Sequence, residues 1–242
     1  MTSLLDAEAL AISGRLNPTS VSVGFGEMVA LIGPNGSGKT SLLRAVAGVD
    51  QSSGTILVAG EDRAETPPAR LPYLLTFLPA SRELGWPIAA RDVIALGLTR
   101  PDPERVEALV DLLELGSLAN RPINALSTGE RARVLFARAM APNPRLLLLD
   151  EPLSNLDPYW ALRFLEIVRD FVSGERSVIV ALHDLDQAER FDRVLLMDRG
   201  SILRDGSPRD VLASAALQDA FGIERLDGRW AIRRPADPRS LR

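Results

Sequence analysis

The sequence predicts an α/β fold built on a mainly parallel sheet. Short, fully apolar runs such as Leu146–Leu149 and Val178–Leu182 alternate with longer helical stretches. Strands that are apolar on both faces are typical of parallel sheets covered by helices on both sides. A glycine-rich segment, 33–40, joins one such run to a helix, and two acids, Asp150 and Glu151, end another. Because ligands of such sheets gather at the carboxyl ends of the strands, both features indicate a site there.

Composition sets limits on what the chain does. The 242 residues are 46% hydrophobic and 25% charged, which is typical of a globular protein with a substantial core. A net charge of -4 argues against nucleic acid as a partner. Cysteine is absent, which excludes disulfides and thiolate zinc sites and fits a reducing compartment. No apolar run approaches the roughly 18 residues of a membrane span, so we expect a soluble or peripheral protein.

The first 78 residues are predicted to form mainly strands. Residues 7–29 alternate in hydropathy around a turn at 15–18, and 54–60 is a strand between glycine turns. The segment 61–72 holds three prolines and many charges, which favours a surface loop. Residues 74–78 then return as a buried strand.

Helical periodicity dominates from residue 79 to 143, and we interpret this block as a subdomain inserted into the sheet core. Helices are expected over 90–97, 102–115 and 129–141, with Asp102 as a cap of the second. Strands over 145–150, 177–182 and 193–197 then alternate with helices over 158–171 and 185–191. Residues 223–242 carry six Arg against three acids, and we expect a short hairpin around Asp227-Gly228 followed by a solvated tail.

The segment GPNGSGKT fits the P-loop pattern G-x-x-x-x-G-K-[ST] completely. Its glycines allow successive N–H groups to turn onto a polyphosphate at a helix N-terminus. Lys39 is placed for the β- and γ-phosphates, and the Thr40 hydroxyl for Mg²⁺. The alternative, a glycine-rich turn of no function, lacks support because the strand and helix context is present. Lys39 is also the one lysine among the 28 Lys and Arg residues. The predicted ATP-binding residues are Gly33, Pro34, Asn35, Gly36, Ser37, Gly38, Lys39, Thr40 and Ser41.

Two adjacent carboxylates at the end of an apolar strand need a cation or a reaction. We expect Asp150 to support the Mg²⁺ coordination sphere and Glu151 to polarise the water that attacks the γ-phosphate. The alternative is a helix cap, since Pro152 follows.

Further motifs point to a family. Leu126-Ser127-Thr128-Gly129-Glu130 resembles the signature motif of ABC-type ATPases, and 145–151 resembles their second nucleotide motif. Ser154-Asn155-Leu156-Asp157 is similar to their D-loop, and His183, the one histidine, to their switch histidine. All five motifs fall in the family's order, and the resemblance extends from Ala7 to about Gly222.

The resemblance implies a P-loop NTPase core with an N-terminal antiparallel β subdomain and an inserted helical subdomain. The ATPase domain would be 1–222, with the core at 1–78 and 144–222, the helical subdomain at 79–143, and an extension at 223–242. It further implies a head-to-tail homodimer in which Ser127, Thr128, Gly129 and Glu130 of one copy close over ATP held by the other. His183 would contact the γ-phosphate, although a lone histidine is more often structural.

Two positions depart from the family pattern. Where many members stack adenine on an aromatic residue, this chain has Arg15, whose guanidinium plane is a hypothetical substitute. Ala80 stands where the family usually has a glutamine beside the metal, so either Glu83 or Arg82 replaces it or the coordination is looser. Thr128 in place of the commoner glycine is a milder change.

The resemblance is strongest to ATPases that energise import of iron-siderophores, haem or cobalamin. It implies membrane permease subunits, a periplasmic binding protein as an indirect partner, and a place on the inner face of the cell membrane. Trp86 and Pro87 would form the floor of the permease groove, or Trp86 packs inside the subdomain. The chain has one ATPase domain, unlike the tandem members of the family. Ser127 follows Lys39 by only 88 positions, which leaves no room for the long coiled coil of other members. A cytosolic ATPase module not coupled to transport stays open as the alternative.

Overall fold

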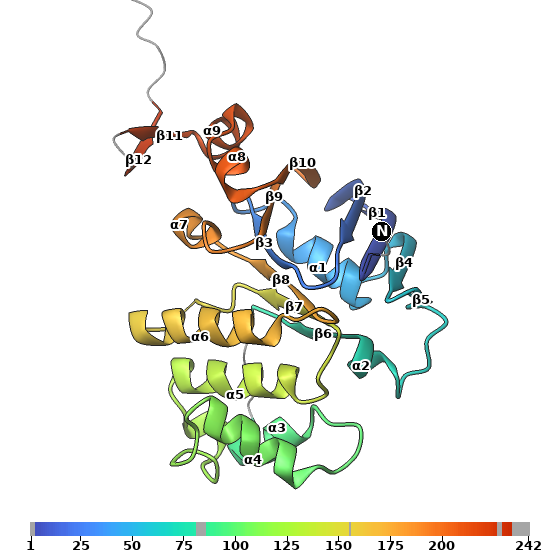
Figure 1. The fold of residues 1–242 in the computed structure, drawn as a ribbon, viewed down its shortest axis with the longest axis vertical. Helices are drawn as coiled ribbons and strands as arrows, with labels where there is room; N and C mark the ends of the chain where they lie inside the picture. Colours follow the sequence, from blue (N-terminus) through green and yellow to red (C-terminus); the bar gives the residue numbers. More distant parts are fainter. Residues whose placement is uncertain (1–2, 81–85, 155, 227–228, 234–242) are drawn as a thin grey trace, which may run out of the picture.

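A six-stranded sheet crosses the middle of the molecule (Figure 1) in a computed structural model that describes residues 3–80, 86–154, 156–226 and 229–233. Its strand order is β10-β9-β3-β8-β7-β6. All neighbours pair in parallel except β9 and β10, so the predicted mainly parallel sheet is confirmed. The strands are β3 (Met28–Ile32), β6 (Leu75–Leu78), β7 (Leu146–Asp150), β8 (Ser177–Ala181), β9 (Arg193–Asp198) and β10 (Ser201–Gly206).

The two faces of this sheet belong to two separate hydrophobic cores. In β3, Met28, Ala30 and Ile32 pack into one core, whereas Val29 and Leu31 pack into the other. β7 and β8 divide their residues between the cores in the same way. Since successive side chains of a strand point to opposite faces, a sheet covered on both sides requires apolar residues at every position. This requirement explains why these strands are continuous apolar runs.

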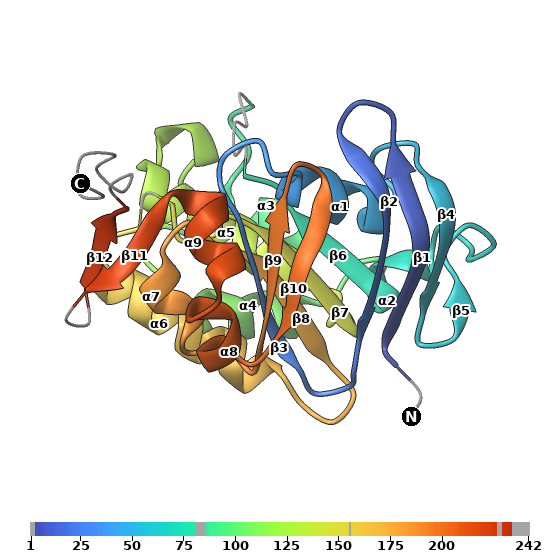
Figure 2. The ribbon, with the colours of Figure 1, turned by 90° about the horizontal axis from the view of Figure 1, so that it is seen from above.

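A smaller antiparallel sheet and α1 (Lys39–Ala47) cover one face. The order is β2-β1-β4-β5, and α1 lies between this sheet and the large one (Figures 1 and 2). The strands are β1 (Leu5–Ile12), β2 (Leu16–Val23), β4 (Ser53–Val58) and β5 (Glu61–Asp62). The turn between β1 and β2 comes earlier than the predicted 15–18, because Gly14, at φ 72°, allows Arg15 N–H to bond Ile12 C=O at 3.0 Å.

Helices cover the other face in two layers, with α5 and α6 against the sheet and α3 and α4 beyond them (Figure 1). The Phe136 and Phe164 rings join α5 to α6 with centroids 4.1 Å apart. Asp102 caps α4 as predicted, accepting a hydrogen bond from Arg105 N–H at 2.9 Å. The helices are α3 (Ala90–Ala95), α4 (Pro103–Leu112), α5 (Thr128–Met140) and α6 (Pro158–Phe171), with a short 3-10 turn at Ile123–Ala125.

Three sequence predictions were wrong in detail. The predicted loop 61–72 contains β5 and the first residues of a short helix, α2 (Leu71–Leu74), whose first turn tolerates Pro72. The helix predicted over 185–191 ends early, as α7 (Leu185–Ala188), because its following residues turn into β9. β10 was not predicted, since none of its residues is buried and its sequence lacks an apolar run.

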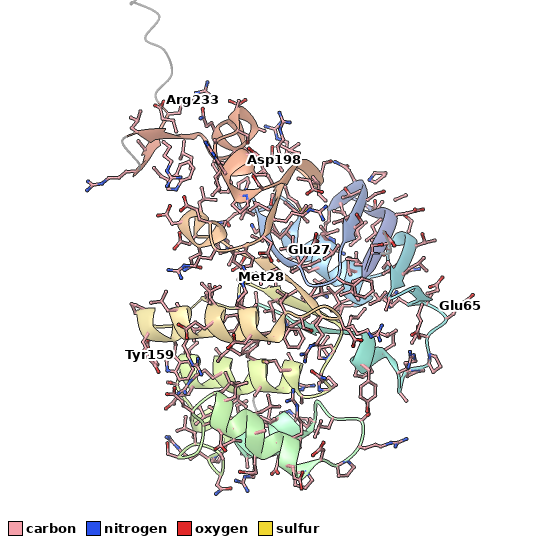
Figure 3. The ribbon with its side chains drawn as sticks, in the orientation of Figure 1. Glu27, Met28, Glu65, Tyr159, Asp198 and Arg233 are labelled. Atoms are coloured by element: carbon pink, nitrogen blue, oxygen red, sulfur yellow. The ribbon has the colours of Figure 1, made fainter. Side chains whose placement is uncertain are left out.

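The chain ends in a small C-terminal unit. Helices α8 (Pro208–Leu212) and α9 (Ala215–Phe221) are followed by an antiparallel hairpin of β11 (Ile223–Leu226) and β12 (Arg229–Ile232). The hairpin was predicted, although its Asp227-Gly228 turn lies outside the described residues. Figure 3 shows Arg233, just after β12, beside α9, where it pairs with Asp219. No helix in the described part of the chain has the length and hydropathy needed to cross a bilayer.

Candidate active site

Three neighbouring parallel strands bring the predicted site residues together. β3 leads into the glycine loop, β7 ends in Asp150 and Glu151, and β8 is followed by His183. In the sheet β3 pairs with β8 and β8 with β7, all in parallel. Their carboxyl ends therefore lie side by side at one edge, where segments 33–41, 150–151 and 183 converge.

Backbone conformation explains the glycines of the loop. Gly33 has φ 155°, and a Cβ at this position would lie 2.2 Å from Met197 O. Gly38, at φ 105°, immediately precedes α1 and has no side chain that could cap it. The first N–H groups of α1 thus have no side-chain acceptor, and with the positive end of the helix dipole they form a site for an anion.

Lys39 is held at this loop by main-chain oxygens. Its Nζ donates hydrogen bonds to Gly33 O at 2.8 Å and Pro34 O at 3.3 Å, and the residue is 5% exposed. Burial lowers the pKa of Lys39 below its usual value, while the nearby carboxylates of Glu151 and Asp150 oppose that shift. The ammonium is pre-positioned beside the anion site, where phosphate charge would raise its pKa again.

Asp150 is a buried acid at the carboxyl end of β7. It is 0% exposed, and neither carboxylate oxygen has a hydrogen bond of ordinary geometry within the described residues. Burial raises the pKa of Asp150, and the nearby Thr40 hydroxyl opposes the shift. An orphaned buried carboxylate close to a threonine hydroxyl fits Mg²⁺, which needs few protein ligands because phosphates and waters supply the others. No group of three or more His, Cys, Asp and Glu side chains in the described residues offers a self-contained metal site.

Glu151 and His183 form a pair at the same edge. His183 Nε2 lies 2.6 Å from Glu151 Oε1, and the Glu151 side chain is only 25% exposed. Glu151 also has φ 50°, a conformation that non-glycine residues rarely adopt and that is concentrated at functional sites. Neither acid caps a helix, because the cap of α6 is Asp157, which accepts a hydrogen bond from Trp160 N–H at 2.9 Å.

The glycine loop and Glu151 border a hollow of about 530 Å³, whereas Asp150 and His183 are not among its lining residues. Its lining includes Asn35–Ser41 and Glu151, together with Arg15, Asn17 and Arg199, of which sequence reasoning found only Arg15. Asn17 Nδ2 donates to Arg199 O at 2.9 Å, which ties the start of β2 to the β9–β10 turn. A larger hollow of about 750 Å³, beside Tyr73 and Arg105, lies away from the glycine loop.

Arg15 is not free to move across the hollow. It pairs with Asp50 at 3.0 Å, and Asp50 is also bonded by Arg44 at 2.7 Å. Hydrogen bonding from Arg44 and the charges of both arginines lower the pKa of Asp50. The side chain of Arg15 is 58% exposed, and its ion pair with Asp50 holds it among the residues that line the hollow.

The signature-like segment lies apart from the hollow. Ser127 is the N-cap of α5 and forms a capping box with Glu130: Ser127 N–H donates to Glu130 Oε2 at 2.8 Å, and Glu130 N–H to Ser127 Oγ at 3.3 Å. Ser127 and Thr128 are exposed and Gly129 is half-buried. None of them lines the hollow, so within one copy they do not reach the glycine loop's ligand.

Ala80, the second departure from the family pattern, lies just after the end of β6. Ala80 is exposed after β6, the strand beside β7, and its methyl group can ligate nothing. Arg82 and Glu83, the predicted replacements, lie outside the described residues, as does Asn155 of the D-loop-like segment. Trp86 is 73% exposed, so the alternative that it packs inside the subdomain is wrong.

Comparison with known proteins decides the family. Residues 16–154 match the family described as ABC transporter, a span that includes the glycine loop, the signature-like segment and Glu151. This chain belongs to the ABC transporter family. Within it the chain has the fold of an ATP-binding cassette.

Relatives and solved structures agree with this assignment. The chain is 37% identical to the hemin import ATP-binding protein HmuV of Pseudomonas entomophila, over 92% of this chain and 94% of that protein. It is 34% identical to HmuV of Roseobacter denitrificans, with 90% of each chain covered. It is also 37% identical to the cobalamin import ATP-binding protein BtuD of Halobacterium salinarum, but spans only 57% of that protein's length.

Solved ATP-binding cassettes share the fold. A nucleotide-free ATP-binding cassette from an ABC transporter superposes with a TM-score of 0.79 at 22% identity, over 91% of this chain and 99% of that one. A dimeric cassette bound to ADP and Pi gives a TM-score of 0.74 at 22% identity, over 85% and 99%. The predicted ABC ATPase fold is confirmed.

Proposed function

We propose that this cassette couples ATP hydrolysis to import through a separate membrane permease. The observation that carries the proposal is the convergence of the glycine loop, Asp150-Glu151 and His183 at three neighbouring strand ends, beside a hollow lined by the glycine loop and Glu151. Each group supplies a different requirement of phosphoryl transfer: a phosphate cradle, a metal site and a means of activating water.

The geometry supports a role for each group. Residues 33–41 hold the polyphosphate, and Lys39 neutralises charge on the β- and γ-phosphates. Thr40 and Asp150 would hold Mg²⁺, which would neutralise negative charge that develops during phosphoryl transfer. Glu151 accepts a proton from the attacking water. His183, 2.6 Å from Glu151, keeps that carboxylate oriented and donates to the γ-phosphate when ATP is bound.

A second copy of the chain completes the site in this proposal. Ser127 and Gly129 lie at the N-terminus of α5, exposed or half-buried and outside their own copy's hollow. A helix N-terminus with a free face attracts anions, and a head-to-tail pair would bring it onto the γ-phosphate of the partner. The dimeric cassette bound to ADP and Pi supports this arrangement. Asp157, at the N-terminus of α6, would face the partner as well.

The permease would dock beside the helical layer. A groove of about 610 Å³ runs between α1, α2 and β6 on one side and α5 and the residues just after α3 on the other. Phe77, Leu96 and Leu135 are among its apolar lining residues. Trp86, 73% exposed, precedes α3 in the chain but does not line the groove. A large exposed aromatic side chain and an apolar groove are both features of protein interfaces.

The transported substrate is the least specific part of the proposal. The hemin and cobalamin import relatives, 34–37% identical over most of this chain, favour an iron chelate, haem or a cobalamin-like compound. Such an importer would place the cassette at the inner membrane face, with a periplasmic binding protein as an indirect partner. We also propose residues 1–222 as the ATPase domain, with the helical subdomain at 79–143. A cassette that acts in the cytosol without a permease is the second candidate, favoured by Ala80 in place of a metal-side glutamine.

ATP turnover tests the proposal. The purified protein should hydrolyse ATP only with Mg²⁺, and Glu151→Gln should lower kcat by roughly a hundredfold or more while ATP still binds. Turnover that survives Glu151→Gln would remove the proposed base. Co-purification with a membrane permease would support the transport function. ATP turnover that a permease does not stimulate, together with failure to associate with any membrane protein, would favour the cytosolic candidate.

A further inference from the structure

The loop that carries His183 depends on a very short helix. Leu182, His183 and Asp184 connect β8 to α7, which has only four residues. Only Leu185 and Ala188 of α7 are buried. A single helical turn is not stable by its own hydrogen bonds, so its position must come from packing and from contacts on its exposed side.

The C-terminal hairpin makes those contacts. Asp186 and Glu189 lie three positions apart, on one face of the α7 turn. Trp230 Nε1 donates a hydrogen bond to Asp186 Oδ1 at 3.0 Å, and Arg225 Nη1 pairs with Glu189 Oε1 at 2.8 Å. Figure 2 shows the hairpin beside α7. Both acids on the outer side of the turn are thereby bonded to the last described element of the chain.

The hairpin's register suits this task. Arg225 of β11 lies directly opposite Trp230 of β12, and the guanidinium carbon lies 5.3 Å from the indole ring. The two residues that hold α7 therefore form one cross-strand pair. Trp230 and Ile223 pack against the main core, and Arg233 pairs with Asp219 of α9. A two-stranded hairpin is marginal in isolation, so these anchors and α7 stabilise one another.

We propose that hairpin β11–β12 is a positioning element for His183, with Trp230 and Arg225 fixing α7 and hence the loop before it. The inference rests on the proposed ATPase function, and it adds residues that lie outside the matched family span of 16–154. Trp230 and Arg225 do not touch the substrate. They act through α7 on the His183–Glu151 pair, whose spacing of 2.6 Å leaves little tolerance for displacement.

Steady-state kinetics test the proposal. Trp230→Phe keeps an aromatic ring but removes the N–H donor, and we expect kcat to fall about threefold to tenfold with KM for ATP unchanged. Asp186→Ala should reproduce the loss, whereas Asp186→Asn, which keeps an acceptor oxygen, should largely restore kcat. Ile232→Thr is the matched control, since Ile232 is 80% exposed on the same hairpin. Unchanged kcat in Trp230→Phe, or an equal loss in Ile232→Thr, would overturn the proposal.

A fluorescence measurement separates this inference from the proposed function. In a Trp86→Phe, Trp160→Phe, Glu151→Gln background Trp230 is the one remaining tryptophan. ATP with Mg²⁺ should change its emission, and ADP should not, because only ATP offers His183 a γ-phosphate. If binding by equilibrium dialysis is intact but ATP leaves the emission unchanged, the coupling is wrong. If the wild-type protein binds ATP without hydrolysing it, the proposed function fails, and the emission still decides whether the hairpin senses the site.

Discussion

Asp150→Asn should make the nucleotide-free protein more stable while abolishing Mg²⁺-dependent hydrolysis. The acid is 0% exposed and its two oxygens lack hydrogen-bond partners in the described part of the chain. An unpartnered buried polar group costs about 1–3 kcal/mol, and more when it is charged. Asparagine has nearly the same shape and no charge. Loss of the attraction to Lys39 offsets part of the gain, so we expect the free energy of unfolding to rise by about 1–2 kcal/mol.

The effect should depend on pH in a defined direction. Burial raises the pKa of Asp150 above its ordinary value of 3.8, so the folded state binds a proton more tightly than the unfolded state. The penalty of the ionised carboxylate is then fully present above the folded-state pKa and disappears below the unfolded one. The advantage of Asp150→Asn should be largest at neutral pH and vanish as the pH falls below about 3.8.

Thermal unfolding without nucleotide measures this change. A gain of this size corresponds to a rise in Tm of roughly 2–8 °C for a chain of this length. Asp102→Asn is the matched control: Asp102 is an exposed helix cap, and asparagine caps as well as aspartate, so Tm should not change. Asp150→Asn, unlike this control, should also show no Mg²⁺-stimulated ATP turnover. If Asp150→Asn lowers Tm, then the carboxylate already has a stabilising partner and the argument for an open cation site fails.

Three further substitutions test separate parts of the site. Gly33→Ala should abolish ATP binding by calorimetry, because its Cβ would lie 2.2 Å from Met197 O; Gly36→Ala, also at positive φ but with open space around its Cβ, should retain more of it. Lys39→Arg should weaken ATP binding by roughly tenfold or more without unfolding the protein, since a planar fork does not fit where Nζ lies 2.8 Å from Gly33 O. Equal affinity of the two proteins would contradict that reasoning. Ser127→Ala should cost about 0.5–2 kcal/mol of stability through the lost cap and also prevent ATP-dependent pairing. Ser214→Ala, which removes a similar cap from α9, should affect stability alone.

Much of the fold could be predicted because its strands are buried on both faces. Leu146–Leu149 and Val178–Ala181 carry an apolar residue at every position. This pattern can be recognised in the sequence without knowing which strands lie beside them. β10 was missed because an exposed edge strand has no such pattern: Leu203, Arg204 and Asp205 are all exposed. The helix after His183 was predicted too long, since only two of its residues are buried and nothing local fixes its end.

Some residues of the site could likewise be predicted from the sequence, and others could not. The glycine loop and the two acids follow continuous local patterns, whereas Asn17 of β2 and Arg199 of the β9–β10 turn, 182 positions apart, meet through a hydrogen bond. Proximity of that kind depends on the tertiary fold, although the Arg199-Gly200 turn between two strands is a local signal that could have pointed to it. The Trp230–Asp186 contact is of the same long-range type and leaves no trace in the sequence pattern.

The most direct test of the central claim is the mass of the Glu151→Gln protein in solution with ATP and Mg²⁺. Sedimentation velocity should show a species of twice 26.2 kDa with ATP and a single chain with ADP. The pairing should disappear when Ser127→Ala is added. A protein that binds ATP yet stays monomeric would contradict a site shared between two copies.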